Sequence, residues 1–570
     1  MMTSAIHSAE QTITAGAIQT EFAELLRRAQ SERLAERIGA GEASVWSSDP
    51  AIRELVSDRL GWLNVASAMQ LNLGDIEHFA EGVFADGVRD VVLLGMGGSS
   101  LCPAVFGQIF RRLPGRGKFL VLDLTSPSAV KRIERQIDIA NCLFVSASKS
   151  GKTVETRSHT EYFWEKVTRA VGSRAKERFV AITDKGSALE QLGRAKSFRR
   201  VFLNPSDIGG RYSALSYFGL VPGALAGVPL RPLLECAVSA QSAGLDSDAS
   251  NSAVELGLLI GGAAKAGRDK LTFMAASVLG PLVPWIEQLI AESTGKNQTG
   301  IIPIENEPLA NAEQYGPDRA FVFFRMEGKP DLHEGLRSQL IRLGHPVVEI
   351  SVADTTQIGG EFFRWELATA VAGWVLGVNP FDEPNVQESK DNTQRVLADL
   401  VSGKAVAQPH GVASGEGFSI LSVSPGTLSS QGDARGIMRG WLDEARQCGY
   451  ISILAFMDDT AENEAVLGSM RRFLGQQTGR ATLRGYGPRY LHSIGQLYKG
   501  GPQTGAFLVI SSDESSDVRI PGADYSFSML KMAQAMGDAE SLVTRGRPLV
   551  HVHLTKDQAG LENLAAMLTS

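Results

Sequence analysis

Residues 142–156 read CLFVSASKSGKTVET, an apolar run that gives way to a loop of Ser, Lys and Gly and then to a helical pattern at 156–170. A short apolar run bounded by small polar residues is typical of a strand buried on both faces of a sheet. Similar runs lie at 91–94, 118–123 and 179–183, with helical stretches between them. Buried strands that alternate with helices predict a parallel sheet covered by helices on both faces.

The same alternation returns twice further along the chain. A second α/β unit is expected to carry strands at 271–274, 321–325 and 347–350, and a third unit to carry strands at 418–422, 450–456, 481–485, 506–510 and 549–554. The similar texture of the first two units indicates a duplicated module.

The length of the chain and the changes in its hydrophobic pattern predict several domains. One hydrophobic core rarely organises 570 residues, so several domains are expected. Residues 1–85 show apolar stripes at helical spacing and are predicted to form a helical N-terminal segment. We expect a first α/β domain at 86–230, a second with its preceding helices at 231–400, and a C-terminal α/β extension at 401–570. The Gly-, Ala- and Ser-rich stretch 401–417 is typical of a linker.

Composition narrows the class of protein. The net charge is −7, which argues against a nucleic-acid or anionic-membrane partner because no basic surplus neutralises phosphates in bulk. The cysteines Cys102, Cys142, Cys236 and Cys448 lie far apart, which indicates free thiols in a reducing compartment. The sequence shows neither a signal peptide nor a membrane-spanning stretch, so we expect a cytoplasmic protein.

The loop that follows the apolar run has the inventory of an anion site. It leads into a predicted helix, whose free N–H groups and positive dipole end favour an anion. The hydroxyl groups of Ser148, Ser150 and Thr153 add donors, and Lys149 or Lys152 adds charge. A phosphomonoester fits this inventory, although a Ser-rich helix cap would have the same composition.

A second loop, GMGGSS at 95–100, also follows a predicted strand. It imitates a dinucleotide-binding fingerprint, but Ser100 stands where the third Gly belongs. We therefore expect a tight loop that brings backbone close to a small ligand rather than a dinucleotide site.

Two further segments place a charged residue in a context that suits chemistry. In Gly-Gly-Arg-Tyr-Ser at 209–213, the two Gly let the chain set the guanidinium of Arg211 deep in a cleft, where it suits an oxyanion. In Glu-Ser-Thr-Gly-Lys at 292–296, Glu292 ends a helix predicted at 281–292, and the negative dipole end of that helix disfavours the ionised carboxylate. A carboxyl group with a raised pKa suits a general base. The residues alone equally allow a structural ion pair and a solvated Glu.

In this order and at these separations, the four segments resemble the glucose-6-phosphate isomerase family, and the chain is most similar to the isomerase half of bacterial transaldolase–isomerase fusion proteins. The resemblance covers nearly the whole chain. It implies an α/β fold with two sugar-isomerase (SIS) modules, each a flavodoxin-like, doubly wound parallel sheet. It also implies interconversion of glucose 6-phosphate and fructose 6-phosphate, so a sugar phosphate is the expected partner and neither a cofactor nor a metal is expected.

The resemblance assigns roles to residues of the four segments. Glu292 would move a proton between C1 and C2, and Arg211 would stabilise the enediolate. The substrate-binding residues would be Ser148, Lys149, Ser150 and Thr153 at the phosphate, and Gly98, Ser99 and Gly210 at the sugar.

Two more residues would open the cyclic sugar. The segment 377–386 resembles the family's Gly-x-Asn-x-Phe-Asp-Gln stretch, which assigns the ring-opening Lys to Lys390 and puts Glu383 where the family has a phosphate-binding Gln. The segment 492–501 resembles the family's His-Ser-x-x-Gln-Leu stretch and assigns the ring-opening His to His492. The family generally places this His before the Lys and draws it from the neighbouring subunit. Its late position leaves open whether the chain forms a homodimer and which chain supplies His492.

Three alternatives stay open from the sequence. A non-catalytic sugar-phosphate sensor built from SIS modules would share the phosphate loop, and an isomerase with a wider pocket would also accept mannose 6-phosphate. A transaldolase, suggested by the fusion relatives, would need an eightfold barrel and a Schiff-base Lys, which the strand count does not fit.

Overall fold

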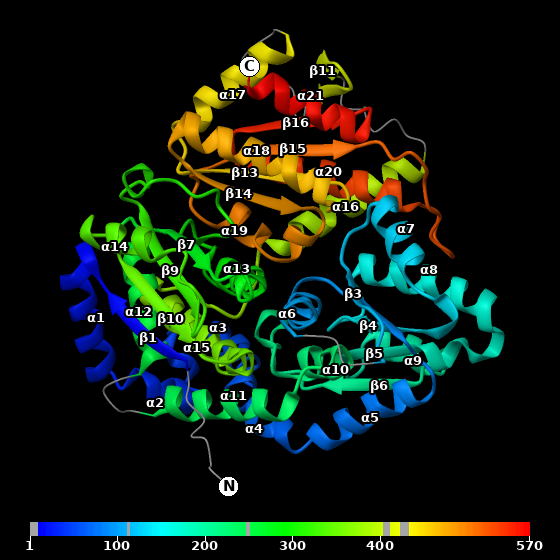
Figure 1. The fold of residues 1–570 in the computed structure, drawn as a ribbon, viewed down its shortest axis with the longest axis horizontal. Helices are drawn as coiled ribbons and strands as arrows, with labels where there is room; N and C mark the ends of the chain where they lie inside the picture. The colour runs from blue at the N-terminus through cyan, green and yellow to red at the C-terminus, as the bar shows by residue number, and fades with distance from the viewer. Residues whose placement is uncertain (1–8, 111–114, 247–250, 403–410, 422–432, 570) are drawn as a thin grey trace.

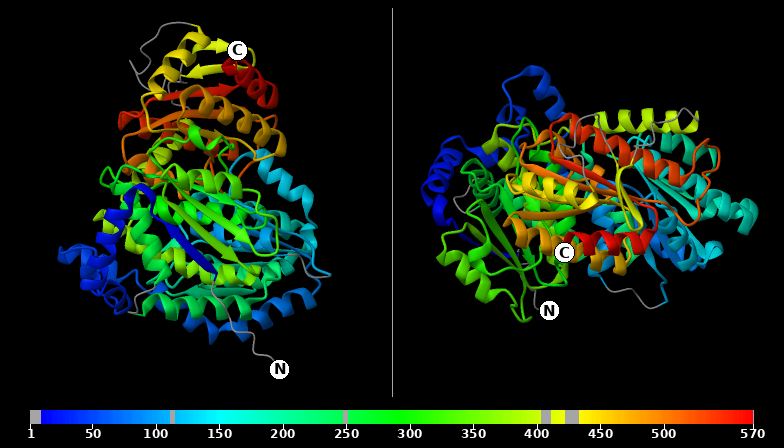
Figure 2. Two further views of the ribbon diagram at one scale, coloured as in Figure 1. Left: turned by 60° about the vertical axis from the view of Figure 1, so that its left-hand side comes forward. Right: turned by 90° about the horizontal axis from the view of Figure 1, so that it is seen from above.

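The computed structural model describes residues 9–110, 115–246, 251–402, 411–421 and 433–569. Three α/β units lie at the corners of a triangle, with the N-terminal helices at the left and along the bottom of the view (Figure 1). Two further views show that the C-terminal unit rests on the other two (Figure 2). None of the helices in the described ranges is long and apolar enough to cross a membrane.

The first unit is a five-stranded parallel sheet. Its strands are β2 (Asp90–Leu94), β3 (Phe119–Leu122), β4 (Cys142–Ala147), β5 (Phe179–Asp184) and β6 (Arg200–Asn204), in the order β3-β2-β4-β5-β6. Its helices are α6 (Leu101–Ile109), α7 (Pro127–Gln136), α8 (Val154–Val171), α9 (Ala188–Ala195) and α10 (Tyr217–Ala226). Numbered within the unit, the strand order is 2-1-3-4-5, as in flavodoxin-like folds. The edge strand β6 was not predicted because it begins with Arg200 and ends with Asn204, which leaves an apolar run of only three residues between them.

The second unit repeats this order. Its parallel strands are β7 (Lys270–Ala275), β8 (Ile302–Ile304), β9 (Arg319–Met326) and β10 (Val347–Val352), in the order β8-β7-β9-β10. Its helices are α11 (Leu230–Leu245), α12 (Ser252–Lys265), α13 (Val283–Thr294), α14 (Glu334–Arg342) and α15 (Ile358–Leu376). The strand β8 was not predicted because it has three residues and contains Pro303, which weakens any strand pattern.

The N-terminal segment corrects one prediction. It contains α1 (Gln19–Ser31), α2 (Leu34–Gly39), α3 (Pro50–Ser57), α4 (Trp62–Gln70) and α5 (Leu73–Ala85), but it opens with β1 (Glu10–Thr14). β1 pairs antiparallel with β10 and takes the fifth place of the second sheet. The segment predicted to be helical therefore also completes a sheet, which this five-residue strand did not reveal because Ile13 is its only apolar residue.

The third unit has the same parallel arrangement again. Its strands are β11 (Gly411–Gly415), β12 (Phe418–Leu421), β13 (Tyr450–Phe456), β14 (Ala481–Tyr486), β15 (Gly505–Ser512) and β16 (Leu549–Leu554). Its helices are α16 (Val386–Val401), α17 (Ala434–Ala445), α18 (Ala461–Thr478), α19 (Gly495–Gly500), α20 (Phe527–Thr544) and α21 (Asp557–Thr569).

The parallel strands of this unit follow the order β14-β13-β15-β16, which is 2-1-3-4 within the unit, and β12 continues the sheet antiparallel to β16. The stretch 401–417 is not simply a linker, because residues 411–415 form β11, which pairs with β12. Residues 403–410 of that stretch lie outside the described residues. The third unit therefore repeats the topology of the first two.

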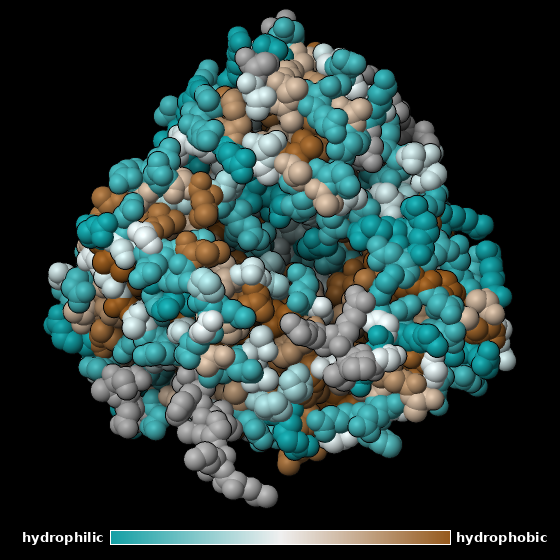
Figure 3. Space-filling model, in the orientation of Figure 1, coloured by the Kyte–Doolittle hydropathy of each residue, from teal (hydrophilic) through white to brown (hydrophobic). Residues whose placement is uncertain are grey.

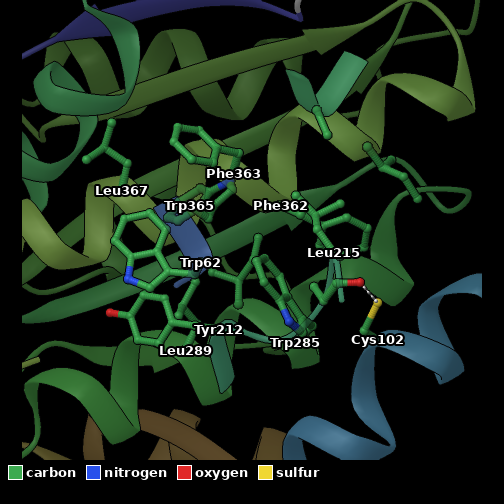
Figure 4. Close-up of a cluster of buried hydrophobic side chains, with 14 of the residues drawn as sticks. Trp62, Cys102, Tyr212, Leu215, Trp285, Leu289, Phe362, Phe363, Trp365 and Leu367 are labelled. Atoms are coloured by element: carbon green, nitrogen blue, oxygen red, sulfur yellow. Dashed lines mark hydrogen bonds between the residues drawn. The ribbon is translucent and has the colours of Figure 1, made fainter. Parts of the chain in front are cut away.

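Three hydrophobic cores hold the units together. One joins the N-terminal helices to the first and second units and surrounds α15, in which Phe362 contacts Trp285 of α13 with ring centroids 4.8 Å apart (Figure 4). In the same core, Trp62 of α4 packs against Tyr212 with ring centroids 5.2 Å apart. This contact fixes the turn that carries Arg211. A second core joins the first and third units, between α8 and α20 among other elements. A third core joins the second and third units, where Ile302 and Ile304 of β8 cluster with residues of β13. The face seen in Figure 1 is hollowed where the three units meet, and mostly hydrophilic residues line the hollow (Figure 3).

Candidate active site

A cavity of about 550 Å³ lies between the three units. It sits at the carboxyl ends of β2, β4 and β5, the edge at which doubly wound sheets bind their ligands. The residues that line it are Met96–Ser99, Ala147–Ser150, Lys152, Thr153, Asp184–Ala188, Gly210, Arg211, Gln288, Glu292, Glu383 and His492. Every site residue predicted from the sequence is among them except Lys390.

The loop between β4 and α8 is closed by its own hydroxyl groups. Ser148 Oγ lies 3.0 Å from Thr153 Oγ1 and accepts a hydrogen bond from the N–H of Gly151. Gly151 has a φ of +68°, and a Cβ atom there would lie 2.2 Å from the backbone N of Leu189, so only Gly fits. α8 begins at Val154, two residues earlier than predicted, and within the described part of the chain no side chain caps it. The positive end of α8 and the loop hydroxyls therefore favour an anion in the cavity.

Lys149 of this loop already has a partner. Its Nζ lies 2.6 Å from Asp184 Oδ2 and donates a hydrogen bond to the carbonyl oxygen of Ser206. Burial raises the pKa of Asp184, and the ammonium group of Lys149 opposes that rise. The carboxylate thus offsets part of the positive charge that Lys149 brings to the cavity.

The Gly-rich loop after β2 is the point where backbone segments of the first and third units approach one another. A Cβ atom on Gly98 would lie 2.0 Å from the carbonyl oxygen of Gly210. Gly97 has a φ of +53°, and a Cβ atom there would lie 2.5 Å from the carbonyl oxygen of His492. The loop is therefore Gly-rich because neighbouring backbone leaves no space for side chains, as the sequence predicted for a close approach.

Arg211 is buried and holds several segments together. Its Nε donates to Ser293 Oγ at 2.7 Å, and its Nη2 donates to the carbonyl oxygens of Pro380 and Asp382 at 2.8 and 2.9 Å. Its Nη1 donates to Glu383 Oε2 at 3.0 Å. The same Nη1 lies 3.8 Å from Glu292 Oε2, so one guanidinium stands between two carboxylates.

Glu292 lies in the last turn of α13 rather than at its end, because α13 continues to Thr294. Its Oε2 accepts a hydrogen bond from Gln288 Nε2 at 3.0 Å. Burial raises the pKa of Glu292, Arg211 opposes the rise, and the nearby carboxylate of Glu383 adds to it. A buried carboxyl group whose pKa is raised is suited to take and return a proton near neutral pH.

Glu383 faces Arg211. Desolvation would raise the pKa of Glu383, but the bond to Arg211 holds it below the usual value. Its segment is anchored by Lys296, whose Nζ donates to the carbonyl oxygens of Asn379 and Asp382. Burial and the neighbouring Arg211 lower the pKa of Lys296 to about 8.

His492 enters the cavity from the third unit of the same chain. Its Nε2 lies 3.0 Å from Glu155 Oε1, and its carbonyl oxygen accepts a hydrogen bond from Gln288 Nε2 at 2.9 Å. Gln288 therefore bridges His492 and Glu292. Burial alone would raise the pKa of Glu155, but His492 outweighs that effect and lowers it, so Glu155 is an ionised acceptor.

Lys390 lies on α16, and its side chain is outside the described part of the structure. Its ring-opening role stays a prediction from the resemblance.

Sequence reasoning missed three residues of this site: Glu155, Asp184 and Gln288. Glu155 was hidden because the helix was predicted to start at 156, which placed this residue in the loop. Gln288 precedes Glu292 by one helical turn, so the (i, i+4) spacing on α13 was the available signal. Asp184 ends a predicted strand, at the sheet edge where the phosphate loop also lies.

Comparisons with known proteins agree with this geometry. The first unit and α13 fall within residues 72–299, which match a family model described as phosphoglucose isomerase. The glucose-6-phosphate isomerase of Mycoplasma capricolum is 26% identical over 391 residues, which are 60% of this chain and 90% of the relative. That of Campylobacter jejuni is 28% identical over 351 residues, which are 54% of this chain and 86% of the relative.

Solved structures show the likeness of fold. A hypothetical protein from Thermus thermophilus superposes with a TM-score of 0.58 at 24% identity, covering 68% of this chain and all of that one. A glucose-6-phosphate isomerase from Chlamydia trachomatis superposes with a TM-score of 0.53 at 18% identity, covering 69% of this chain and 89% of the other. The α/β fold of SIS type predicted from the sequence is confirmed. The chain is thus similar to proteins named glucose-6-phosphate isomerase, in agreement with the resemblance of its motifs.

The pair of Lys149 and Asp184 leads to a prediction about anion affinity. Asp184→Asn removes a negative charge from the cavity wall, so inorganic phosphate should bind more tightly, by roughly five- to tenfold for a unit charge several ångströms away. Titration calorimetry with inorganic phosphate at fixed ionic strength measures the change. Asp86→Asn, which breaks a surface pair with Arg199, is the matched control and should leave the affinity unchanged. Weaker binding by Asp184→Asn would mean that Asp184 serves the site by holding Lys149 in place.

Proposed function

We propose that the protein interconverts glucose 6-phosphate and fructose 6-phosphate by opening the sugar ring and moving a proton between C1 and C2 through an enediolate. The observation that carries the proposal is the meeting, in one cavity, of an anion-binding loop, a buried carboxyl group with a raised pKa and a buried guanidinium. The relatives named glucose-6-phosphate isomerase support the same reaction.

The phosphate would lie against the loop Ser148–Thr153 at the start of α8. A sugar phosphate anchored there would place its reacting carbons in the same cavity as Glu292 and Arg211. Glu292 would remove the proton from C2 and return it to C1, and general acid–base help of this kind is worth about 10²–10⁴-fold. Arg211, whose Nη1 lies beside the base, would meet the negative charge that develops on the enediolate oxygens.

Ring opening would rest on His492. Because Nε2 faces the ionised Glu155, Nε2 carries the hydrogen and Nδ1 keeps a lone pair that can exchange a proton with the ring oxygen. Lys390 is the second ring-opening group that the resemblance implies. Since His492 lines the cavity from the same chain, we expect one chain to supply the whole site, whether or not the protein forms a homodimer.

A sugar-phosphate sensor without catalysis would also need the phosphate loop. It would not need a buried carboxyl group with a raised pKa between a guanidinium and an imidazole, so these groups favour the isomerase. Tolerance for mannose 6-phosphate depends on how the wall around Glu292 receives the C2 hydroxyl. An isomerase assay with mannose 6-phosphate as substrate tests whether the protein accepts this sugar.

The proposed role of the base is tested by Glu292→Gln. The amide keeps the size of the side chain but cannot accept the proton, so we expect turnover of fructose 6-phosphate to fall by about 10²–10⁴-fold. Binding of inorganic phosphate should be unchanged because the phosphate loop belongs to another element. A coupled assay for glucose 6-phosphate measures the first effect and calorimetry the second. Full activity of Glu292→Gln would remove Glu292 from the mechanism, and inactivity of the unaltered protein would remove the function.

The pH dependence of kcat/KM should show how Glu383 affects the pKa of Glu292. Glu383 raises the pKa of Glu292 and occupies Arg211, so Glu383→Gln should lower the pKa of Glu292. Because the base must be ionised, the acidic limb of kcat/KM against pH should move to lower pH. The profile of Glu388→Gln, which changes a carboxylate on the following helix, should match the unaltered protein. An acidic limb that stays in place or moves to higher pH in Glu383→Gln would contradict this account.

A further inference from the structure

A glutamine of the third unit is built into the contact between Glu155 and His492. Gln534 lies on α20 and is 1% exposed. Its Nε2 donates to Glu155 Oε1 at 2.7 Å, and its Oε1 accepts a hydrogen bond from Thr125 Oγ1 at 2.8 Å. Thr125 and Glu155 belong to the first unit, so this one amide ties α20 to two places on that unit.

The two hydrogen bonds of Gln534 fix the direction of its amide. An ionised carboxylate accepts hydrogen bonds and cannot donate them, so the NH₂ group must face Glu155. The hydroxyl of Thr125 then donates to Oε1 of Gln534, so a flipped amide would lose both hydrogen bonds. Glu155 Oε1 is thereby held in one position, and it is the same oxygen that His492 Nε2 contacts at 3.0 Å.

The same helix also holds the turn that carries His492. Asp538 follows Gln534 by one helical turn and lies on the same face of α20. Asp538 pairs with Lys499 at 2.6 Å, both side chains being at most 2% exposed, and it accepts a hydrogen bond from the hydroxyl of Tyr490. Tyr490 and His492 lie in one short turn, Arg489–His492. One face of α20 therefore fixes both members of the Glu155–His492 pair.

We propose that Gln534 is a positioning residue for ring opening: by holding Glu155 Oε1 against His492 Nε2, it keeps the proton on Nε2 and leaves Nδ1 free to exchange a proton with the ring oxygen of the sugar. The inference rests on the proposed function. It assigns to the third unit a second contribution besides His492 itself. Without Gln534, Glu155 loses a donor and can turn away from His492, so imidazoles with the proton on Nδ1 become more populated.

The test separates ring opening from the later proton transfer. Fructose 6-phosphate closes a ring through O5, whereas 5-deoxyfructose 6-phosphate has no O5 and stays open. Gln534→Met keeps the length of the side chain but removes the donor to Glu155. We expect kcat/KM of Gln534→Met to fall by roughly 10–100-fold on fructose 6-phosphate, the range seen when a supporting hydrogen bond to a functional His is lost. On 5-deoxyfructose 6-phosphate it should stay within about twofold of the unaltered protein.

A matched control is Gln241→Met. Gln241 is also buried and bridges two helices, since its Nε2 donates to Ser67 Oγ at 3.0 Å, but it does not line the cavity. This variant should treat both substrates as the unaltered protein does. If Gln534→Met does not fold, Gln534→Leu, which also removes the donor to Glu155, is measured in the same way, and the same selective loss is expected.

The possible results for the two substrates distinguish failure of the inference about Gln534 from failure of the proposed function. A selective loss on fructose 6-phosphate supports the inference. An equal loss on both substrates would show that Gln534 only supports the fold, and no loss on either would show that Glu155 needs no second donor; both results overturn the inference while leaving the isomerase in place. If the unaltered protein converts neither substrate, the proposed function fails and the inference falls with it.

Discussion

The contact between His492 Nε2 and Glu155 Oε1 links the third unit to the first unit and positions His492 at the cavity. It joins the turn that follows β14 to the start of α8, beside the loop that we propose binds the phosphate. Three residues before His492, Arg489 makes two hydrogen bonds to the buried carboxylate of Asp123 in the first unit. A polar contact of this kind needs close and lasting alignment, which the hydrophobic core shared by the first and third units provides.

The three units share the strand order 2-1-3-4 but contribute differently to the cavity. In each, ligands are expected where the first and third strands diverge. In the first unit that position carries the Gly-rich loop and the phosphate loop. In the third unit it carries Asp458, which is already paired with Arg132 and would repel an anion. The first unit therefore supplies the anion site, while the second supplies Glu292 and the third supplies His492.

Local sequence patterns predicted the α/β class and picked out segments that the fold brings to one cavity. The loop at 148–153, Arg211 and Glu292 all line this cavity, and their catalytic and binding roles stay predictions. The strands β1, β6 and β8 were not predicted, since each has at most three consecutive apolar residues. Boundaries of one or two residues also mattered, because the late start given to α8 concealed that Glu155 lies on the helix.

Other parts of the site depend on long-range contacts that no local pattern encodes. Gln534 and Glu155 are 379 positions apart, and nothing in the helical pattern around 534 distinguishes its amide from a surface glutamine. His492 is a similar case. Its segment could be recognised from the sequence, but its position after Lys390 left open whether His492 would line the cavity of its own chain or that of a neighbouring subunit. In the structure, His492 lines the cavity of its own chain, and we infer that it acts there.

The central claim is that one chain holds the whole site, and mixing two inactive variants tests it most directly. Glu292→Gln and His492→Ala are each inactive on this account, for unrelated reasons. The two proteins are unfolded and refolded together, so that any subunits can exchange, and isomerase activity is measured. A site completed within one chain predicts no activity beyond that of the variants alone. Recovery of activity in the mixture would show that His492 acts in a neighbouring subunit and would contradict the account.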